Sequence, residues 1–508
     1  MDKAKCIFGN EISQRDYEKA CKAAAKNRAK FGDDSEVVYH LQAQDAPVIG
    51  ERLGVRLLSL NPDEEAARID LFEDAASCPE PIETDRTVTR ASGKPLVVGN
   101  IRMGFGHYRI SMAIASAAHA MGFVPYWFDL NSFQGSTCSK LVEYQNKLYS
   151  MGSRLSQKVG PFNSLYWEPL NSEGFRQLTY NAGDQKNAEL MTPVYRDLPS
   201  DIPFVATHAW PAQAAVHAGL TNVVNAIPDN WPMALHLAEG STHTVQTPGA
   251  YLGYKMLRGM DGSNVLKPMP QGSIVNVGHY IDHELVSNIE NDCAARKLRA
   301  AAGAPVRYLI CIGGAGAQQD FVAALIEHLM PEVSEGRATL LINVGDHRQV
   351  YKNLRKTIPE LRGAQLHFDD FEETEAFCDE AASSTDIGGL HVFYNSDIFA
   401  AVYSTNILMR ICDVLVTKPS ELAFYPVPKL MIKRVGGHEA WGAICTSELG
   451  DGTYELSTTA EACAMLSLLQ QERTIITDMC DAIVAQNTLG TYDGAYRAAA
   501  LAAGIDWQ

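Results

Sequence analysis

The fold is decided by a stretch that reads VRYLICIGGAGAQQDFVAALIEHLM, residues 306–330. An apolar run typical of a buried strand ends in a glycine-rich turn, and the turn leads into a segment that predicts a helix. Residues 95–122, PLVVGNIRMGFGHYRISMAIASAAHAMG, have the same design. Two strand–turn–helix openings, well separated along the chain, predict two α/β units, each built on a parallel sheet.

Further apolar runs follow each opening, as expected where strands and helices alternate. They occur at residues 124–130, 203–208, 221–227, 243–247 and 273–278 in the first unit and at residues 338–345, 364–368, 389–394 and 413–418 in the second. This alternation predicts parallel sheets covered by helices. We therefore expect an α/β protein with two Rossmann-like domains that face each other across a cleft.

The expected division of the chain has three parts. They are an N-terminal extension at residues 1–92, a first Rossmann-like domain at residues 93–285, and a second one with a helical, alanine-rich tail at residues 286–508. Within the extension, the pattern predicts a helix at 14–29, a short strand at 37–41 and an acidic, loop-rich connection at 61–93. We expect the extension to pack on the first domain.

The composition excludes several classes of protein. Of the 508 residues, 46% are hydrophobic, which is enough to fill real cores, and the net charge of −17 argues against nucleic acid as a main partner. No apolar run approaches the ~18–20 residues of a membrane span. The opening MDKAKCIFGNEISQRD lacks the apolar region of a signal peptide. The 11 cysteines include no CxxC pair, which indicates reduced thiols in a cytoplasmic protein and argues against a zinc site.

The turn of the first opening contains Gly104, Gly106 and His107. Glycines between a strand and a helix let the backbone approach a ligand and leave free N–H groups at the helix start. His107 would face the cleft there and act as a general base, although a capping or solvent-exposed histidine is the alternative interpretation. The spacing is not GxGxxG, which argues against a nicotinamide dehydrogenase.

The second domain has two candidate ligand-binding segments. Gly313, Gly314 and Gly316 form the turn of its opening, which is a natural cradle for a diphosphate, unless the glycines serve only packing. Residues 413–443, DVLVTKPSELAFYPVPKLMIKRVGGHEAWGA, place polar side chains at strand ends and helix starts, where open α/β sheets bind ligands. These side chains are Thr417, Lys418, Ser420, Glu421, His438 and Glu439.

Residues 413–443 resemble the donor-binding region of GT-B glycosyltransferases such as the peptidoglycan N-acetylglucosaminyltransferase and monogalactosyldiacylglycerol synthase. SELAFYPVP keeps the spacing from Glu421 to Pro428, and GGHEAWGA resembles the GQE turn of those families. GFGHYRIS resembles their GGGH opening, whose histidine faces the acceptor. NAIPDNWPMALHLAEGSTHTVQT resembles their middle region and has Asp229 in the place of its aspartate. The glycine-rich piece that usually follows TK is missing here.

The resemblance implies a glycosyltransferase that moves a sugar from a nucleotide donor, with UDP-sugars favoured, to an acceptor hydroxyl. Inversion without a metal or cofactor is implied, with His107 or Asp229 accepting the proton. Glu421 would hold the ribose hydroxyls and Glu439 the donor sugar. The remaining donor-side positions are Gly313, Gly314, Gly316, Thr417, Lys418, Ser420 and His438, and the acceptor-side positions are Gly104, Gly106 and Trp231. The acidic stretch FDDFEETE is interpreted as a solvated helix start rather than a metal site.

Two alternatives remain open. One is a nucleotide-sugar epimerase on the same fold, which would need a buried acid–base set around the sugar. The other is a non-catalytic protein that binds a sugar nucleotide. Release of nucleotide from the donor separates an enzyme from a binding protein, and transfer to an added acceptor separates a transferase from an epimerase.

The acceptor is not identified by the sequence, and both a lipid and a small molecule remain open. Residues 139–167, SKLVEYQNKLYSMGSRLSQKVGPFNSLYW, predict a basic amphipathic helix with aromatic neighbours. Its charged side chains are Lys140, Lys147, Arg154 and Lys158, opposed by Glu143. Such a helix can lie on an anionic membrane surface. The alternative is an ordinary surface helix whose apolar side packs on the sheet.

Overall fold

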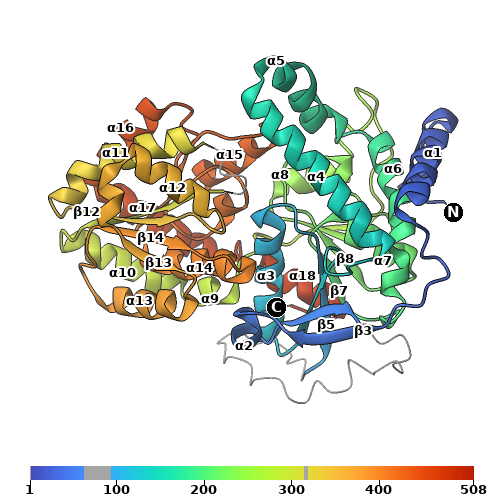
Figure 1. The fold of residues 1–508 in the computed structure, drawn as a ribbon, viewed down its shortest axis with the longest axis horizontal. Coiled ribbons are helices and arrows are strands. Elements are labelled where there is room, and N and C mark those ends of the chain that lie inside the picture. The colour runs from blue at the N-terminus through green and yellow to red at the C-terminus, as the bar shows by residue number, and fades with distance from the viewer. Residues whose placement is uncertain (1, 62–92, 314–317, 508) are drawn as a thin grey trace.

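The computed structural model describes residues 2–61, 93–313 and 318–507. Two sheets lie side by side, each covered by helices (Figure 1). The predicted α/β class and the two Rossmann-like units facing across a cleft are confirmed. All strands predicted after residue 93 are found, and the strand expected to begin at Pro428 is found as well.

The first sheet has eight strands in the order β10-β9-β8-β7-β5-β6-β4-β3, and all neighbours are parallel except β3 and β4. The strands are β3 Leu41–Asp45, β4 Arg56–Leu60, β5 Pro95–Asn100, β6 Val124–Asp129, β7 Phe204–Ala206, β8 Val223–Ala226, β9 Thr242–Val245 and β10 Ile274–Asn276. In β5, Leu96 and Val98 enter one core and Val97 enters the other. Burial on both faces explains why these strands are apolar runs rather than alternating patterns.

The second sheet has six strands in the order β13-β14-β12-β11-β15-β16, all parallel. They are β11 Val306–Cys311, β12 Ala338–Asn343, β13 Gln365–Phe368, β14 Leu390–Tyr394, β15 Val414–Thr417 and β16 Lys429–Met431. Here too the side chains alternate between two cores: Leu309 packs with the helices next to the first unit, and Ile310 packs on the opposite face.

The helices cover both sheets and the space between them. They are α1 Gln14–Phe31, α2 Ile49–Leu53, α3 Phe105–Ala120, α4 Thr137–Lys158, α5 Gly160–Phe162, α6 Leu178–Ala188, α7 Ala209–His217, α8 Pro248–Lys255, α9 His283–Val286, α10 Ile289–Ala301, α11 Gln319–Ser334, α12 Arg348–Thr357, α13 Phe371–Ser383, α14 Ile398–Ile411, α15 Ala440–Leu449, α16 Thr459–Gln471, α17 Thr474–Thr488 and α18 Gly494–Ala503. The predicted helix at 14–29 and the helical tail are confirmed.

The described part of the N-terminal extension is built into the first unit. β3 and β4 complete its sheet, and α1 packs on α6. The predicted strand at 37–41 is wrong, because β3 starts only at Leu41. The guanidinium of Arg196 donates hydrogen bonds to the carbonyl oxygens of Ser35 and Val37. The backbone just before β3 is therefore bonded by a side chain rather than by a neighbouring strand. Most of the predicted connection at 61–93 lies outside the described residues.

The chain passes between the two units twice, and its C-terminal helix α18 returns to the first unit, where it packs on α3 (Figure 1). At the crossing, the N–H of His279 donates to the carbonyl of Thr491 at 2.6 Å, and the N–H of Gly494 donates to the carbonyl of His279 at 2.9 Å. These two crossing segments connect the units as a pair.

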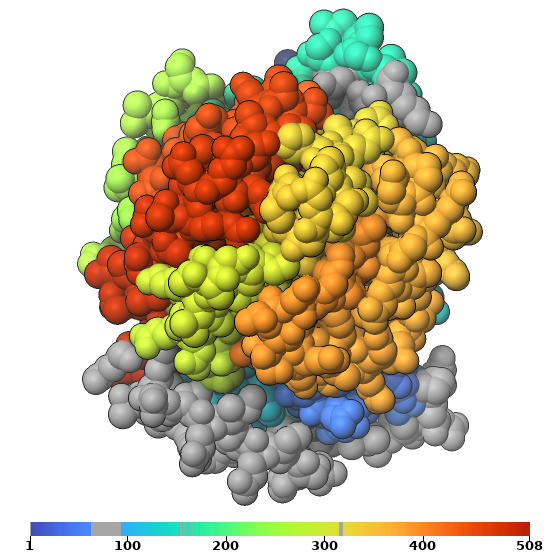
Figure 2. Space-filling model, turned by 90° about the vertical axis from the view of Figure 1, so that its left-hand side faces the viewer, coloured from blue at the N-terminus to red at the C-terminus, as the bar shows by residue number. Residues whose placement is uncertain are grey.

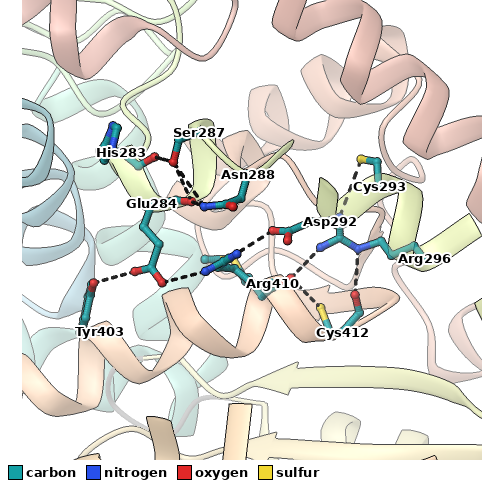
Figure 3. Close-up of polar contacts among 11 residues, drawn as sticks. His283, Glu284, Ser287, Asn288, Asp292, Cys293, Arg296, Tyr403, Arg410 and Cys412 are labelled. Carbon is teal, nitrogen blue, oxygen red and sulfur yellow. Dashed lines mark hydrogen bonds and ion pairs between the residues drawn. The ribbon is translucent and has the colours of Figure 1, made fainter. Parts of the chain in front are cut away.

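Short polar contacts fasten the helices after the first crossing to α14 (Figure 3). Glu284 of α9 accepts from the Tyr403 hydroxyl at 2.6 Å and from Arg410 at 3.3 Å. Arg296 of α10 donates to the carbonyl of Cys412 at 2.8 Å and to that of Met409 at 2.7 Å, so it caps the C-terminal end of α14. The side of the cleft formed by the second unit is therefore fixed to the connection between the units.

Candidate active site

A cleft of about 580 Å³ lies between the two units, at the carboxyl ends of their parallel strands. In the first unit its walls come from the loops after β5, β7 and β8 and from α4 with the turns that follow it. In the second unit they come from the loops after β11, β12, β15 and β16. The predicted site residues that line it are Gly104, Gly106, His107, Asp229, Gly313, Lys418, Ser420, Glu421, His438 and Glu439. Their convergence follows from the strand order, because each residue follows the end of a strand.

The loop after β5 brings His107 into the first turn of α3. Gly104 precedes this turn with φ +83°, a conformation that side chains rarely adopt. The Nδ1 of His107 donates to the carbonyl oxygen of Thr207 at 2.7 Å. Burial lowers the pKa of His107, although the hydrogen bond to Thr207 and the carboxylates of Asp229 and Glu421 oppose this effect. The imidazole is therefore neutral at pH 7, and its Nε2 carries a lone pair.

Asp229 reaches the cleft from the loop after β8 and is paired with a histidine. Its Oδ2 lies 3.3 Å from Nε2 of His236, and Nδ1 of His236 lies 2.7 Å from the hydroxyl of Tyr254. The Asp229 side chain is 32% exposed, whereas that of His236 is only 5% exposed. Burial lowers the pKa of His236 to about 4. Asp229 thus presents a carboxylate to the cleft from a buried polar chain.

Trp231 does not line the cleft. Its ring packs against Trp441 of α15, with centroids 5.9 Å apart, and the guanidinium of Arg176 lies over it at 4.6 Å. This aromatic contact joins the two units beside the cleft. The predicted place of Trp231 on the acceptor side stays a prediction.

The donor-side turn after β11 is described only in part. Gly313 lies close to Lys418, since a Cβ at this position would be 3.3 Å from Cε of Lys418. Gly314 and Gly316 lie outside the described residues, so their predicted role in holding a diphosphate stays a prediction.

Lys418, which is partly exposed, forms an ion pair with the buried Glu439, and both side chains line the cleft. The second carboxylate oxygen of Glu439 accepts from the N–H groups of Val435 and Gly436, at 2.7 and 3.2 Å, and so shapes the GGHE turn. Burial alone would raise the pKa of Glu439, but the charge of Lys418 lowers it to about 2. The same carboxylate, with that of Glu421, raises the pKa of Lys418 against the effect of burial. The lysine is thus held charged beside the cleft.

Glu421 begins a short 3-10 turn, Glu421–Phe424, after β15. Its Oε1 lies 3.9 Å from Nε of Arg109, a buried arginine on α3 of the first unit. Arg109 also donates to the side chains of Asn406 and Thr405 on α14, at 3.1 and 3.2 Å. One arginine of the first unit thus contacts both the α14 helix and the candidate donor residue of the second unit.

Three further predicted donor-side residues differ in position. Ser420 and His438 line the cleft. Thr417 faces a small adjoining hollow of about 20 Å³, and its hydroxyl donates to the carbonyl of Lys418 at 3.3 Å. Thr417 therefore shapes the turn in which Lys418 lies.

Two contacts join the units across the mouth of the cleft. Arg102 donates to Asp346 at 3.1 Å, and the ring of Phe105 stacks on His347 with centroids 5.6 Å apart. All four side chains line the cleft. The cleft is thus narrowed by side chains that follow β5 in one unit and β12 in the other.

Several residues at or beside the cleft were not predicted from the sequence. His208 directly follows an apolar run, as the predicted site residues do, so the same rule would have found it. His236 and Arg109, which lines the adjoining hollow, have no such signal. His236 lies in the short 3-10 helix Ala234–His236, and Arg109 lies within the α3 pattern. Asp346 follows β12 closely, and the strand-end rule applies to it as well.

The described residues contain neither a metal-binding cluster nor a helix suited to cross a membrane. Across residues 2–61, 93–313 and 318–507, no three His, Cys, Asp or Glu side chains gather so as to hold a metal ion. No helix in the same part of the chain combines the length and apolarity needed to span a membrane.

Comparisons with known proteins match the chain to two families and to several solved structures. Residues 6–256 match a domain of unknown function (DUF6937), and residues 269–503 match a second one (DUF6938). A search of curated proteins finds no match.

Three solved structures illustrate the similarity of fold. UDP-GlcNAc 2-epimerase from Neisseria meningitidis, bound to UDP-GlcNAc, is 10% identical, with a TM-score of 0.42 over 80% of this chain and 97% of that one. Trehalose 6-phosphate synthase from Burkholderia multivorans is 13% identical, with a TM-score of 0.41 over 81% and 98%. A spinosyn rhamnosyltransferase complexed with thymidine diphosphate is 13% identical, with a TM-score of 0.28 over 81% and 96%.

Proposed function

We propose that this protein is a glycosyltransferase that moves a sugar from a nucleoside-diphosphate sugar, with UDP-sugars favoured, to an acceptor hydroxyl. One observation carries the proposal: a neutral histidine with a lone pair on Nε2 faces, across one cleft, a charged lysine and two carboxylates at strand ends of the other unit. These are a proton acceptor and a set of groups suited to a sugar nucleotide.

The donor half of the proposal rests on Lys418 and Glu421. An ammonium group has three donors, and only one is needed by Glu439, so Lys418 can also bind phosphate oxygens. The carboxylate of Glu421 has two oxygens that suit the paired hydroxyls of a ribose. Gly313 beside Lys418 leaves room for the diphosphate. Glu439 holds Lys418 and the GGHE turn, and its remaining lone pairs can accept from the donor sugar.

The reaction proposed for this cleft is a single displacement with inversion. The acceptor oxygen forms a bond to the anomeric carbon while its proton passes to Nε2 of His107. The bond between that carbon and the phosphate oxygen breaks, and its electron pair stays on the nucleoside diphosphate. Lys418 stabilises the charge that develops there. No step in this scheme requires a metal or cofactor.

A nucleotide-sugar epimerase is the second candidate, and the pair of Asp229 and His236 is the observation that favours it. An epimerase needs acid and base groups around one sugar, and this pair adds a second proton-carrying site to that of His107. Epimerisation would change the sugar without transferring it. A protein that only binds the sugar nucleotide would do neither.

The acceptor side has an apolar tip formed by α4, α5 and the π-helical turn Asn163–Trp167. Leu165 is 80% exposed, Tyr166 is 59% exposed and Met151 is 55% exposed. The turquoise part of the chain that contains this tip projects at the top of the molecule (Figure 2). Because Tyr149 and Trp167 of the same segment line the cleft, we propose that the acceptor approaches along the tip and that a lipid surface can present it.

The experiment that tests the proposed function is incubation with a panel of UDP-, dTDP- and GDP-sugars. Release of nucleoside diphosphate, followed by mass spectrometry of added polyol, glycan and lipid acceptors, supports a transferase. Conversion of the donor to an epimer, observed by NMR without net release, supports the second candidate. Absence of both, with nucleotide binding intact, would leave only a binding protein.

A further inference from the structure

The cleft contains a second histidine whose protonation is fixed by the fold. We propose that His208 donates a hydrogen bond to the acceptor while His107 takes the acceptor's proton, so that the acceptor is a polyol or sugar with neighbouring oxygens. The reaction in this inference rests on the proposed function. The placement of the two protons rests on the hydrogen bonds of the two histidines.

The tautomer of His107 follows from its partner. A carbonyl oxygen only accepts hydrogen bonds, so the bond of 2.7 Å from Nδ1 to Thr207 places the proton on Nδ1. A neutral ring then has no proton on Nε2. His107 therefore presents an acceptor of protons to the cleft.

The tautomer of His208 is the opposite one. His208 is the N-cap residue of α7, and its Nδ1 accepts from the backbone N–H of Trp210 at 3.1 Å. A backbone N–H only donates, so Nδ1 carries no proton. Burial, with His107 and His236 nearby, lowers the pKa of His208 well below its usual value, so the ring is neutral and its proton is on Nε2.

The two rings are neighbours with complementary Nε2 atoms. Their centroids are 4.9 Å apart, the planes are inclined by 77°, and both side chains line the cleft. Within the described ranges of the chain, the hydrogen bonds of the two rings are those of their Nδ1 atoms. The segment from Thr207 to Trp210 fixes both tautomers, since it supplies the carbonyl group for one ring and the N–H for the other.

A pair with one acceptor and one donor matches two adjacent oxygens of a polyol. One hydroxyl donates its proton to Nε2 of His107 and attacks the anomeric carbon, and the neighbouring oxygen accepts from Nε2–H of His208. His208 keeps its proton throughout. His107 ends as an imidazolium whose Nδ1–H remains hydrogen-bonded to the carbonyl oxygen of Thr207. An isolated hydroxyl would use only one of the two rings.

The first test is the tautomer of each ring, measured by two-bond ¹H–¹⁵N NMR on protein with ¹⁵N-labelled histidine at pH 7. We expect the Nδ1–H form for His107 and the Nε2–H form for His208, with His107→Gln and His208→Gln used to assign the signals. An Nδ1–H or doubly protonated His208 would overturn the proposal. This measurement does not depend on any transferase activity.

The second test compares two substitutions of His208 that separate its roles. Asparagine places its oxygen near Nδ1 and is a good N-cap residue, so His208→Asn keeps the cap and loses the donor. Glutamine places its amide near Nε2, so His208→Gln keeps the donor and loses the cap, which should lower Tm by roughly 1–3 °C. The probe is methyl α-D-glucopyranoside, with cyclohexanol as the single-hydroxyl control, both added in the presence of UDP.

We expect the glucoside to shift the His107 and His208 signals of the wild-type protein and cyclohexanol to shift them much less. His208→Asn should weaken glucoside binding roughly tenfold, and His208→Gln should weaken it less than His208→Asn does. A purely structural role predicts the reverse order, with His208→Gln the more damaging substitution, and would refute the proposal. Equal shifts with cyclohexanol would refute it too. If no nucleotide binds but the glucoside results hold, the proposed transferase function fails and the assignment of the two histidines stands.

Discussion

The carboxylate of Glu421 lies directly against Gly106, since a Cβ at Gly106 would come within 3.3 Å of Glu421 Oε2. Gly106 belongs to the first turn of α3, which also contains His107, and Glu421 follows β15 of the other unit. The candidate ribose-binding group thus rests on the helix that holds the proposed base. A donor bound at Glu421, as proposed, would therefore press on the helix turn that places His107.

We expect Gly106→Ala to reduce nucleotide-sugar affinity while the protein stays folded. The added methyl group displaces the carboxylate of Glu421, whereas alanine is a better helix former than glycine by roughly 0.5–1 kcal/mol. Calorimetry with UDP-sugar and thermal unfolding measure the two effects. Glu421→Ala should weaken binding by roughly 1.5–3 kcal/mol. If Gly106→Ala and Glu421→Ala both bind the donor as the wild type does, Glu421 has no part in binding.

The matched control for Gly106→Ala is Gly183→Ala. Gly183 also lies in a helix, α6, and a Cβ there would meet no atom within 4 Å. This substitution should raise stability by a similar amount and leave donor affinity unchanged. A loss of affinity in the control would show that the binding assay responds to unrelated changes.

Lys418→Met should weaken binding of UDP much more than binding of uridine. The ammonium group is proposed to contact the diphosphate, which uridine lacks. The substitution also leaves Glu439 buried without its partner, which costs roughly 3–5 kcal/mol of stability. Isothermal calorimetry and urea unfolding separate the two effects. The double variant with Glu439→Gln should recover stability but not UDP affinity, and recovery of both would refute the assignment to the diphosphate.

His107→Ala should lower turnover by roughly 10²–10⁴-fold with donor affinity and Tm near wild type. His328→Gln, a histidine substitution on the exposed face of α11, is the control. Because the pKa of His107 is lowered, the base stays deprotonated at pH 6.5, and the acid limb of the rate profile should lie below that value. An acid limb above pH 7, or normal turnover in His107→Ala, would exclude His107 as the base.

Local patterns predicted the sheets and most of the cleft, because strand ends and glycine turns are visible in short windows of sequence. The prediction of a strand at 37–41 was wrong because the carbonyl oxygen of Val37 accepts a hydrogen bond from Arg196, a residue far along the chain. The contact of Trp231 with Trp441 was not predicted for a similar reason, since Trp441 belongs to the other unit. Such contacts depend on how the units meet, which no local pattern encodes.

The same limit applies to the chemistry of the site. His107 was found because it follows two glycines at a helix start, whereas its tautomer depends on Thr207. The pairing of Asp229 with His236 depends on a buried chain that ends at Tyr254. Sequence can therefore nominate a group for proton transfer, but its protonation state depends on tertiary neighbours.

Asp282→Asn should become more stable relative to wild type as the pH rises from 4 to 8. Asp282 is fully buried at the connection between the units, and burial raises its pKa to about 7, although the Tyr425 hydroxyl donates to it at 2.9 Å. Between about pH 4 and 7 the native state keeps a proton that the unfolded chain has released, so wild-type stability falls with rising pH. Asparagine does not titrate, and the difference should reach up to about 4 kcal/mol.

Urea unfolding of both proteins at pH 5, 6, 7 and 8 measures this difference. The control is Asp261→Asn, which makes the same chemical change at an exposed surface residue of the first unit. A constant difference between Asp282→Asn and wild type would mean that Asp282 is ionised in the native state throughout.

The last prediction concerns the apolar tip beside the cleft. The protein should sediment with anionic phosphatidylglycerol vesicles at low salt and less at moderate salt, because the tip combines exposed apolar side chains with the basic Lys147 on α4. Leu165→Ser with Tyr166→Ser should remove the apolar part of binding, and Lys147→Glu should remove much of its salt dependence. Val265→Ser, at a position 90% exposed but outside the tip, is the matched control and should bind as wild type does. If the wild type does not bind vesicles, or if Val265→Ser loses as much binding as the tip variants, the tip does not contact lipid, and the acceptor must be sought among molecules free in solution.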